Sequence, residues 1–146
     1  MNKIISVCRI LQKFLAAASY WHDPYDEERY RKGSTFLALI NNENTINEQY
    51  KRNLMSLKKL VLVKLLTDEV IVPNDSAWFG FFGKDENGAA VIVSLEESEL
   101  YKQDKIGLKQ MNKEKKLKFI GSVTTHFNFD ELWFRNNIIK FLKEVY

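Results

Sequence analysis

A nearly continuous apolar run lies close to the middle of the chain and reads Leu60-Val61-Leu62-Val63-Lys64-Leu65-Leu66. Because it lacks polar alternation, this run predicts a strand buried on both faces, as in parallel sheets that helices cover on each side. Thr67 and Asp68 end the run. Residues 117–121 predict a second strand, and residues 90–95 predict a shorter one. The fold class that these runs predict is α/β.

Helical patterns dominate the part of the chain before this run. Apolar residues recur at three- and four-residue steps over residues 4–18, and residues 26–40 begin acidic and end apolar. The Thr and Glu at the two ends of residues 45–48 have the spacing of a capping box and predict the start of a further helix. A last helix is predicted to close the chain, beginning at Asn128 or Asp130.

The chain of 146 residues has the length of one domain, and its character changes once, near residue 57. We therefore expect residues 1–57 to form a helical segment and residues 58–146 to carry the strands. The 22 Lys and Arg residues are interspersed with 19 Asp and Glu residues, and Glu114 interrupts the most basic stretch, residues 113–118. This pattern indicates a solvated surface and no nucleic-acid partner.

The single cysteine, Cys8, excludes an intrachain disulfide and a cysteine-based metal site. It falls on the apolar face of a predicted helix, which favours a small core residue over a nucleophile. The N-terminus superficially resembles a secretory signal peptide, but Arg9, Gln12 and Lys13 interrupt its apolar residues, so we do not predict one. No apolar run has the length needed to span a bilayer.

Asp68 and His126 are the candidate functional residues, because each comes just after a predicted strand. Since ligand sites in open α/β sheets lie at the carboxyl ends of strands, we expect the two side chains within hydrogen-bond reach at one sheet edge. A carboxylate that holds imidazole Nδ1–H is one half of the machinery of a catalytic triad. By pattern alone, a turn-forming aspartate and a structural histidine remain the commoner explanation.

Two further residues, Asp75 and His22, offer alternatives. Asp75 could serve as the acid in place of Asp68, but it follows Pro73 and Asn74 in a turn-like stretch. His22 has no second histidine at metal-ligand spacing, so we expect it to be structural and predict no metal site.

Six segments in order along the chain resemble the palmitoyl-protein thioesterases, lysosomal enzymes that remove long-chain fatty acyl groups from cysteine. They read Tyr20-Trp21-His22-Asp23-Pro24, Ala38-Leu39-Ile40-Asn41, Asn47-Glu48-Gln49-Tyr50-Lys51, Asn53-Leu54-Met55, Asp75-Ser76-Ala77-Trp78-Phe79-Gly80-Phe81 and Leu100-Tyr101-Lys102-Gln103-Asp104-Lys105-Ile106-Gly107-Leu108-Lys109. The resemblance extends from about residue 10 to the end of the chain.

This resemblance implies the C-terminal portion of an α/β-hydrolase fold, with residues 1–57 as a helical cap and residues 58–146 as the C-terminal part of the core. It assigns the family's acid to Asp68 and its histidine to His126. The family's serine lies in a Gly-x-Ser-x-Gly elbow, and none of the six glycines brackets a serine in this way. We therefore expect the nucleophile to be missing and the chain alone to be inactive.

The implied reaction is hydrolysis of fatty acyl thioesters, with S-acylated proteins or peptides as substrates and no metal or organic cofactor. Val70 and Ile71 follow the acid directly and are the residues best placed to contact a fatty chain. The family implies a lysosomal or secretory location. The alternative is a non-catalytic, truncated product that at most binds lipid or a partner.

Residues 74–76, Asn-Asp-Ser, match the N-glycosylation pattern that such enzymes use. At the family's usual glycosylation positions this chain has no sequon: they correspond to residues 33–35, 47–49 and 67–69. The sequence leaves open whether Asn74 carries a glycan.

Overall fold

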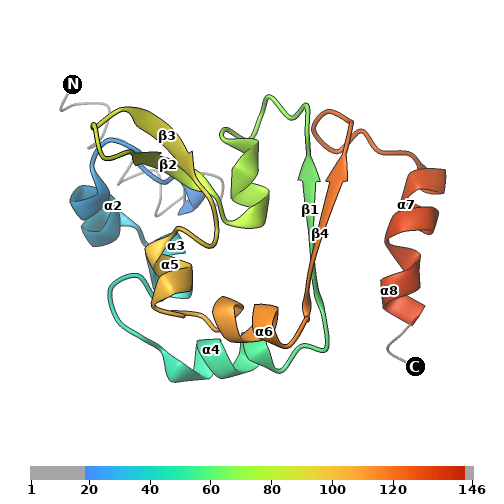
Figure 1. Cartoon of the computed structure of the whole chain (residues 1–146), viewed down its shortest axis with the longest axis horizontal. Helices are drawn as coiled ribbons and strands as arrows, with labels where there is room; N and C mark the ends of the chain where they lie inside the picture. Colours follow the sequence, from blue (N-terminus) through green and yellow to red (C-terminus); the bar gives the residue numbers. More distant parts are fainter. Residues whose placement is uncertain (1–18, 144–146) are drawn as a thin grey trace.

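The computed structural model describes residues 19–143. Its elements, in chain order, are α2 (Glu27–Gly33), α3 (Leu37–Ile40), α4 (Glu48–Met55), β1 (Leu60–Leu65), the 3₁₀ helix η2 (Asn74–Trp78), β2 (Phe81–Lys84), β3 (Ala90–Val93), α5 (Glu99–Lys102), α6 (Leu108–Lys113), β4 (Leu117–Ser122), α7 (Glu131–Asn137) and α8 (Ile139–Lys143). Figure 1 shows β1 and β4 side by side, with α7 and α8 on one side and the remaining elements on the other. This mixture of helices and small sheets is that of an α/β protein.

Two small sheets form the strand part of the described residues. β1 and β4 are parallel, and their register runs from Leu60 opposite Leu117 to Leu65 opposite Ser122. β2 and β3 form an antiparallel hairpin, whose turn is built on Asp85: its side chain accepts from the backbone N–H groups two and four residues on. The strands predicted from the runs at residues 60–66, 90–95 and 117–121 are therefore confirmed.

β1 differs from its prediction in burial. All six of its residues are half-buried, whereas the apolar run predicted a strand buried on both faces. The reason is the number of neighbours, since within residues 19–143 the only strand paired with β1 is β4. The apolar run thus has more surface to cover than the described elements provide.

The start of α4 corrects the capping box expected at residues 45–48. The cap is Asn47, whose Oδ1 accepts hydrogen bonds from the backbone N–H groups of Gln49 (3.0 Å) and Tyr50 (3.2 Å). Asn42, only 1% exposed, fixes this position because its side chain binds both the N–H and the C=O of Asn47. The same side chain also reaches the carbonyl of Lys105 at 2.9 Å.

Other helical predictions are right in place and wrong in length. The segment at residues 26–40 forms two short helices, α2 and α3, because the chain leaves the helix after Gly33. The closing helix is capped by Asp130, one of the two residues proposed for its start, and it divides into α7 and α8. The amphipathic segment at residues 4–18 lies outside the described residues, as does Cys8.

The buried core lies at the starting ends of β1 and β4. Leu95, Ile106, Leu108, Met111 and Leu117 form its centre, and residues of α4 and the first residue of β1 pack against it. Gly107, with φ of 89°, lets α6 begin against α4, since a Cβ there would lie 2.3 Å from the Met55 side chain. The core fixes where the two strands begin, and their other ends are left to carry loops. In the part of the chain that is described, no helix has the length and apolarity to cross a bilayer.

Candidate functional site

The site lies where β1 and β4 end, at the edge of the sheet away from the core (Figure 1). Because the two strands are parallel and adjacent, the chain leaves both of them at the same edge. Two backbone hydrogen bonds continue the pairing beyond the strands, from Leu66 N–H to the Ser122 carbonyl (2.8 Å) and from Thr67 N–H to the Thr124 carbonyl (3.4 Å). The loops that carry Asp68 and His126 therefore start side by side.

Asp68 and His126 are in direct contact. The Nδ1 atom of His126 lies 2.8 Å from Oδ2 of Asp68, although the two residues are 58 positions apart in the sequence. The aspartate side chain is 6% exposed and the histidine side chain 31% exposed. The two candidate residues thus meet as expected, with the carboxylate shielded and the imidazole reaching the surface.

The carboxylate of Asp68 is fully engaged. Its second oxygen, Oδ1, accepts hydrogen bonds from the backbone N–H groups of Val70 (2.8 Å) and Ile71 (3.2 Å). The hydrogen bond with His126 is the main cause that holds the pKa of the Asp68 carboxyl below its usual range, the two backbone bonds add to it, and desolvation opposes it. Asp68 is therefore ionised at neutral pH and orients the imidazole.

The imidazole of His126 has one nitrogen engaged. With Nδ1 donating to Asp68, the neutral ring carries its acceptor lone pair on Nε2, and within residues 19–143 that atom makes no hydrogen bond. Phe127 lies edge-on to the ring, 4.4 Å between centroids, and is 75% exposed. A base oriented in this way can take a proton from a group placed opposite Nε2.

Apolar side chains project from the same loop as Asp68. Val70 is 67% exposed, Ile71 45% and Val72 67%, although all three are large and apolar. The two residues expected to contact a fatty chain, Val70 and Ile71, therefore lie beside the Asp68–His126 pair with their side chains at the surface. Their backbone amides hold Asp68 at the same time.

An open pocket that the sequence did not predict lies beside the His126 loop. Its volume is about 420 Å³, and it lies between the end of β4 and the start of α7. Small polar side chains and two aromatic rings line most of it: Thr67, Ser122, Thr124, Thr125, Phe129 and Trp133. A loop rich in Ser and Thr after a strand is ordinary turn composition, so the sequence carried no signal for this pocket.

The alternative acid, Asp75, lies elsewhere. Its carboxylate accepts a hydrogen bond from Nζ of Lys64 at 2.8 Å, which ties η2 to β1. Nζ of Lys64 also lies 4.4 Å from the centroid of the Trp78 ring. Asp75 therefore belongs to the packing of η2 on β1, and of the two candidate acids it is Asp68 that contacts His126.

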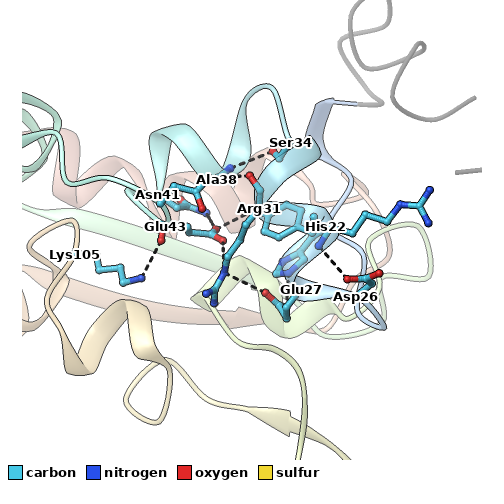
Figure 2. Close-up of polar contacts among 12 residues, drawn as sticks. His22, Asp26, Glu27, Arg31, Ser34, Ala38, Asn41, Glu43 and Lys105 are labelled. Atoms are coloured by element: carbon cyan, nitrogen blue, oxygen red, sulfur yellow. Dashed lines mark hydrogen bonds and ion pairs between the residues drawn. The ribbon is translucent and has the colours of Figure 1, made fainter. Parts of the chain in front are cut away.

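His22 takes part in a second polar cluster, on the side of the molecule that holds α2 (Figure 2). Its Nε2 lies 2.6 Å from Oε1 of Glu27, and its ring stacks between Tyr30 at 3.7 Å and Phe81 at 4.1 Å. Figure 2 shows Arg31 reaching towards Glu27 from the same helix. Among the described residues no group of three or more His, Cys, Asp or Glu side chains could hold a metal ion.

Comparison with known proteins places the chain among thioesterases. A family model described as palmitoyl protein thioesterase matches residues 2–126. Palmitoyl-protein thioesterase 1 of Caenorhabditis elegans is 45% identical over 130 residues, which are 89% of this chain and 43% of the relative. Palmitoyl-protein thioesterase 3 of Dictyostelium discoideum is 38% identical (81% and 40%), and Lysosomal thioesterase PPT2-B of Xenopus laevis is 34% identical (77% and 38%). The chain spans about two fifths of the length of these curated relatives.

Proposed function

The chain belongs to the palmitoyl protein thioesterase family, and we propose that it supplies the acid, Asp68, and the base, His126, of a triad that hydrolyses fatty acyl thioesters. The observation that carries the proposal is the 2.8 Å contact between Asp68 and Nδ1 of His126, with Nε2 making no bond in residues 19–143. That is the arrangement in which a triad histidine accepts a proton from its nucleophile.

In the proposed reaction, Nε2 of His126 takes the proton of a serine hydroxyl as the serine oxygen attacks the thioester carbonyl. Asp68 stabilises the imidazolium that forms. The tetrahedral intermediate then breaks its C–S bond, and His126 returns the proton to the departing cysteine thiolate. A water molecule, deprotonated by the same nitrogen, attacks the acyl-serine and releases the fatty acid, and the proton returns to serine. No cofactor takes part in these steps.

The serine is proposed to come from a part of the protein other than this chain. None of the six glycines in the sequence brackets a serine in a Gly-x-Ser-x-Gly pattern. The relatives are more than twice as long as the region that matches, so the remaining three fifths of such a protein has room for the elbow and its strand. The half-buried side chains of β1 support the proposal, because strands from the remaining part of such a protein could cover them.

The substrates are proposed to be S-acylated proteins or peptides, in a lysosomal or secretory compartment. Two relatives are named palmitoyl-protein thioesterases and a third is named a lysosomal thioesterase. Val70 and Ile71 follow Asp68 directly, and their exposed side chains support a role in contacting the fatty chain, because burial of apolar surface is the main source of affinity for such a group.

A second candidate follows from the missing elbow: alone, the chain acts as a non-catalytic module that at most binds lipid or a partner. The two candidates differ in a simple assay. We expect the isolated chain to hydrolyse a palmitoyl thioester no faster than its own His126→Ala variant. The proposal assigns only the acid and the base to this chain, and it assigns the nucleophile and the oxyanion donors to another part of the protein. Turnover that His126→Ala abolishes would show a nucleophile within the chain.

The test of the triad is a chimera in which residues 19–143 replace the region they match in the 45% identical relative. We expect the chimera to hydrolyse a palmitoyl thioester, and Asp68→Ala to lower kcat/KM roughly 10⁴-fold, as loss of a triad acid does. Asp75→Ala is the matched control, and it should retain most of the activity because that carboxylate binds Lys64. A chimera that keeps its activity in Asp68→Ala contradicts the assignment.

A further inference from the structure

The acid loop, residues 67–73 between β1 and η2, is not held by the packing of its own large side chains. Val70, Ile71 and Val72 are all exposed, and among the large apolar residues and proline of this loop only Pro73 is buried. Ordering each loop residue nonetheless costs conformational entropy. Hydrogen bonds must therefore hold the loop in the shape that presents Asp68 to His126.

One side chain joins the two ends of this loop. Asn74, the first residue of η2, donates from Nδ2 to the carbonyl of Leu66 at 3.0 Å and to the carbonyl of Leu65 at 3.3 Å. The Leu65 carbonyl also accepts the backbone N–H of Asp68, at 3.2 Å. The Asn74 amide therefore shares an acceptor with the backbone of the candidate acid.

Asn74 is presented from a fixed platform. η2 is attached to β1 by contacts that involve no residue of the acid loop: the Lys64–Asp75 ion pair at 2.8 Å and the hydrogen bond from Trp78 Nε1 to the Leu62 carbonyl at 3.1 Å. Lys64 lies over the Trp78 ring as well. The position of Asn74 is thus set independently of the loop that it closes.

We propose that Asn74 is a positioning residue, which closes the acid loop through Leu65 and Leu66 and so holds Asp68 against His126. The inference rests on the proposed function of the Asp68–His126 pair. It also gives the sequon at residues 74–76 a different meaning, because an N-glycan is attached through the same Nδ2 atom that reaches the two carbonyls. A glycan on Asn74 in the folded natural protein would overturn the proposal.

Hydrogen exchange at the amides of Val70 and Ile71 tests the closure of the loop, since both amides donate to Asp68. In the 146-residue chain, Asn74→Leu keeps the size of the side chain and removes the donor. We expect exchange at these two amides to speed up roughly 3- to 10-fold relative to the amides of β1, the effect of losing one ordinary hydrogen bond. Ser76→Ala is the control: it destroys the sequon, leaves the Asn74 amide in place and should change neither rate.

The tautomer of His126, measured by ¹⁵N chemical shifts of its ring, gives a readout that a general loss of stability does not move. The native chain should hold the neutral ring with its proton on Nδ1, and Asn74→Leu should increase the share of the other tautomer. Asp68→Ala separates the two hypotheses. If it leaves the tautomer unchanged, the pair itself and the proposed function fail. If it changes the tautomer while Asn74→Leu changes neither tautomer nor exchange, only the role of Asn74 is wrong.

Discussion

Two imidazole–carboxylate pairs lie in different parts of this molecule, and their sequence surroundings are alike. His22 and His126 each stand four residues before an aspartate that caps a short helix, Asp26 for α2 and Asp130 for α7. Each ring contacts one carboxylate, at 2.6 Å for His22 and 2.8 Å for His126. Local sequence pattern therefore does not separate them.

The difference lies in which ring nitrogen is engaged and in what surrounds the ring. The Nε2 atom of His22 is hydrogen-bonded to Glu27, and its ring is stacked between Tyr30 and Phe81, so both faces of the ring are covered. The Nδ1 atom of His126 is hydrogen-bonded to Asp68, and its Nε2 atom makes no hydrogen bond within residues 19–143. A structural histidine contributes through packing, whereas a candidate base must leave one nitrogen for its reactant.

The largest expected effect concerns activity. In the chimera, His126→Ala should lower kcat/KM by roughly 10⁴-fold or more, because the base that accepts the serine proton is removed. His22→Ala should lower it by less than about tenfold, once corrected for the amount of folded protein, since its ring is occupied by packing. Steady-state kinetics with a palmitoyl thioester decides the comparison, and equal losses in the two variants would remove the distinction.

Stability should show the reverse order. His22→Ala should destabilise the chain by about 2 to 3 kcal/mol, because it removes two stacked ring contacts and the partner of Glu27. His126→Ala removes a ring with one edge-on aromatic neighbour, Phe127, which is itself exposed, so its loss should be smaller. Urea unfolding followed by far-ultraviolet circular dichroism measures both, and His22→Phe, which keeps the stacking, should recover part of the first loss.

The caps of α2 and α7 should have nearly equal effects. Oδ1 of Asp26 accepts from the Arg29 N–H at 2.9 Å, and Oδ1 of Asp130 from the Trp133 N–H at 2.6 Å. Substitution of either aspartate by alanine should cost about 1 kcal/mol in the free energy of unfolding. Because α7 follows the His126 loop, only Asp130→Ala should also lower the activity of the chimera. Loss of activity with Asp26→Ala alone would reverse this expectation.

The strands followed from local patterns, because the apolar runs that form them are continuous in the sequence. The runs at residues 60–66 and 117–121 gave β1 and β4, and their matched ends predicted that Asp68 and His126 would meet. The predicted cap of α4 was wrong because the buried side chain of Asn42 binds the N–H and the C=O of Asn47 and so fixes Asn47 as the cap. The capping-box spacing does not include these hydrogen bonds.

The parts of the site that the sequence did not predict all depend on contacts between segments. The polar pocket beside His126 forms only when the end of β4 lies next to α7. The hydrogen bonds from Asn74 to the carbonyls of Leu65 and Leu66 were not predicted, because the sequon at residues 74–76 suggested a glycan on the same side chain. The burial of β1 was overestimated because an apolar run shows only that a strand has apolar side chains on both faces. The described elements cover part of these faces and leave all six residues half-buried.

The smallest expected effect is on the dependence of stability on pH, and it again compares the two pairs. Hydrogen bonding to His22 is the main cause that holds the pKa of the Glu27 carboxyl below its ordinary value of 4.5, and the hydrogen bond with His126 does the same for Asp68 below 3.8. A carboxyl whose pKa is lower in the folded state adds stability above its unfolded pKa and loses it as pH falls through the folded value. The contribution of Glu27 should therefore begin to disappear below about pH 4.5, and that of Asp68 only below about pH 3.8. Because the Glu27 side chain is 47% exposed, its share should be less than about 1 kcal/mol.

Urea midpoints measured between neutral pH and pH 3 test this expectation. Glu27→Gln should flatten the first part of the decline in stability with falling pH, and Asp68→Asn should flatten the later part. A decline that neither variant changes would mean that other carboxyl groups determine the loss of stability in acid.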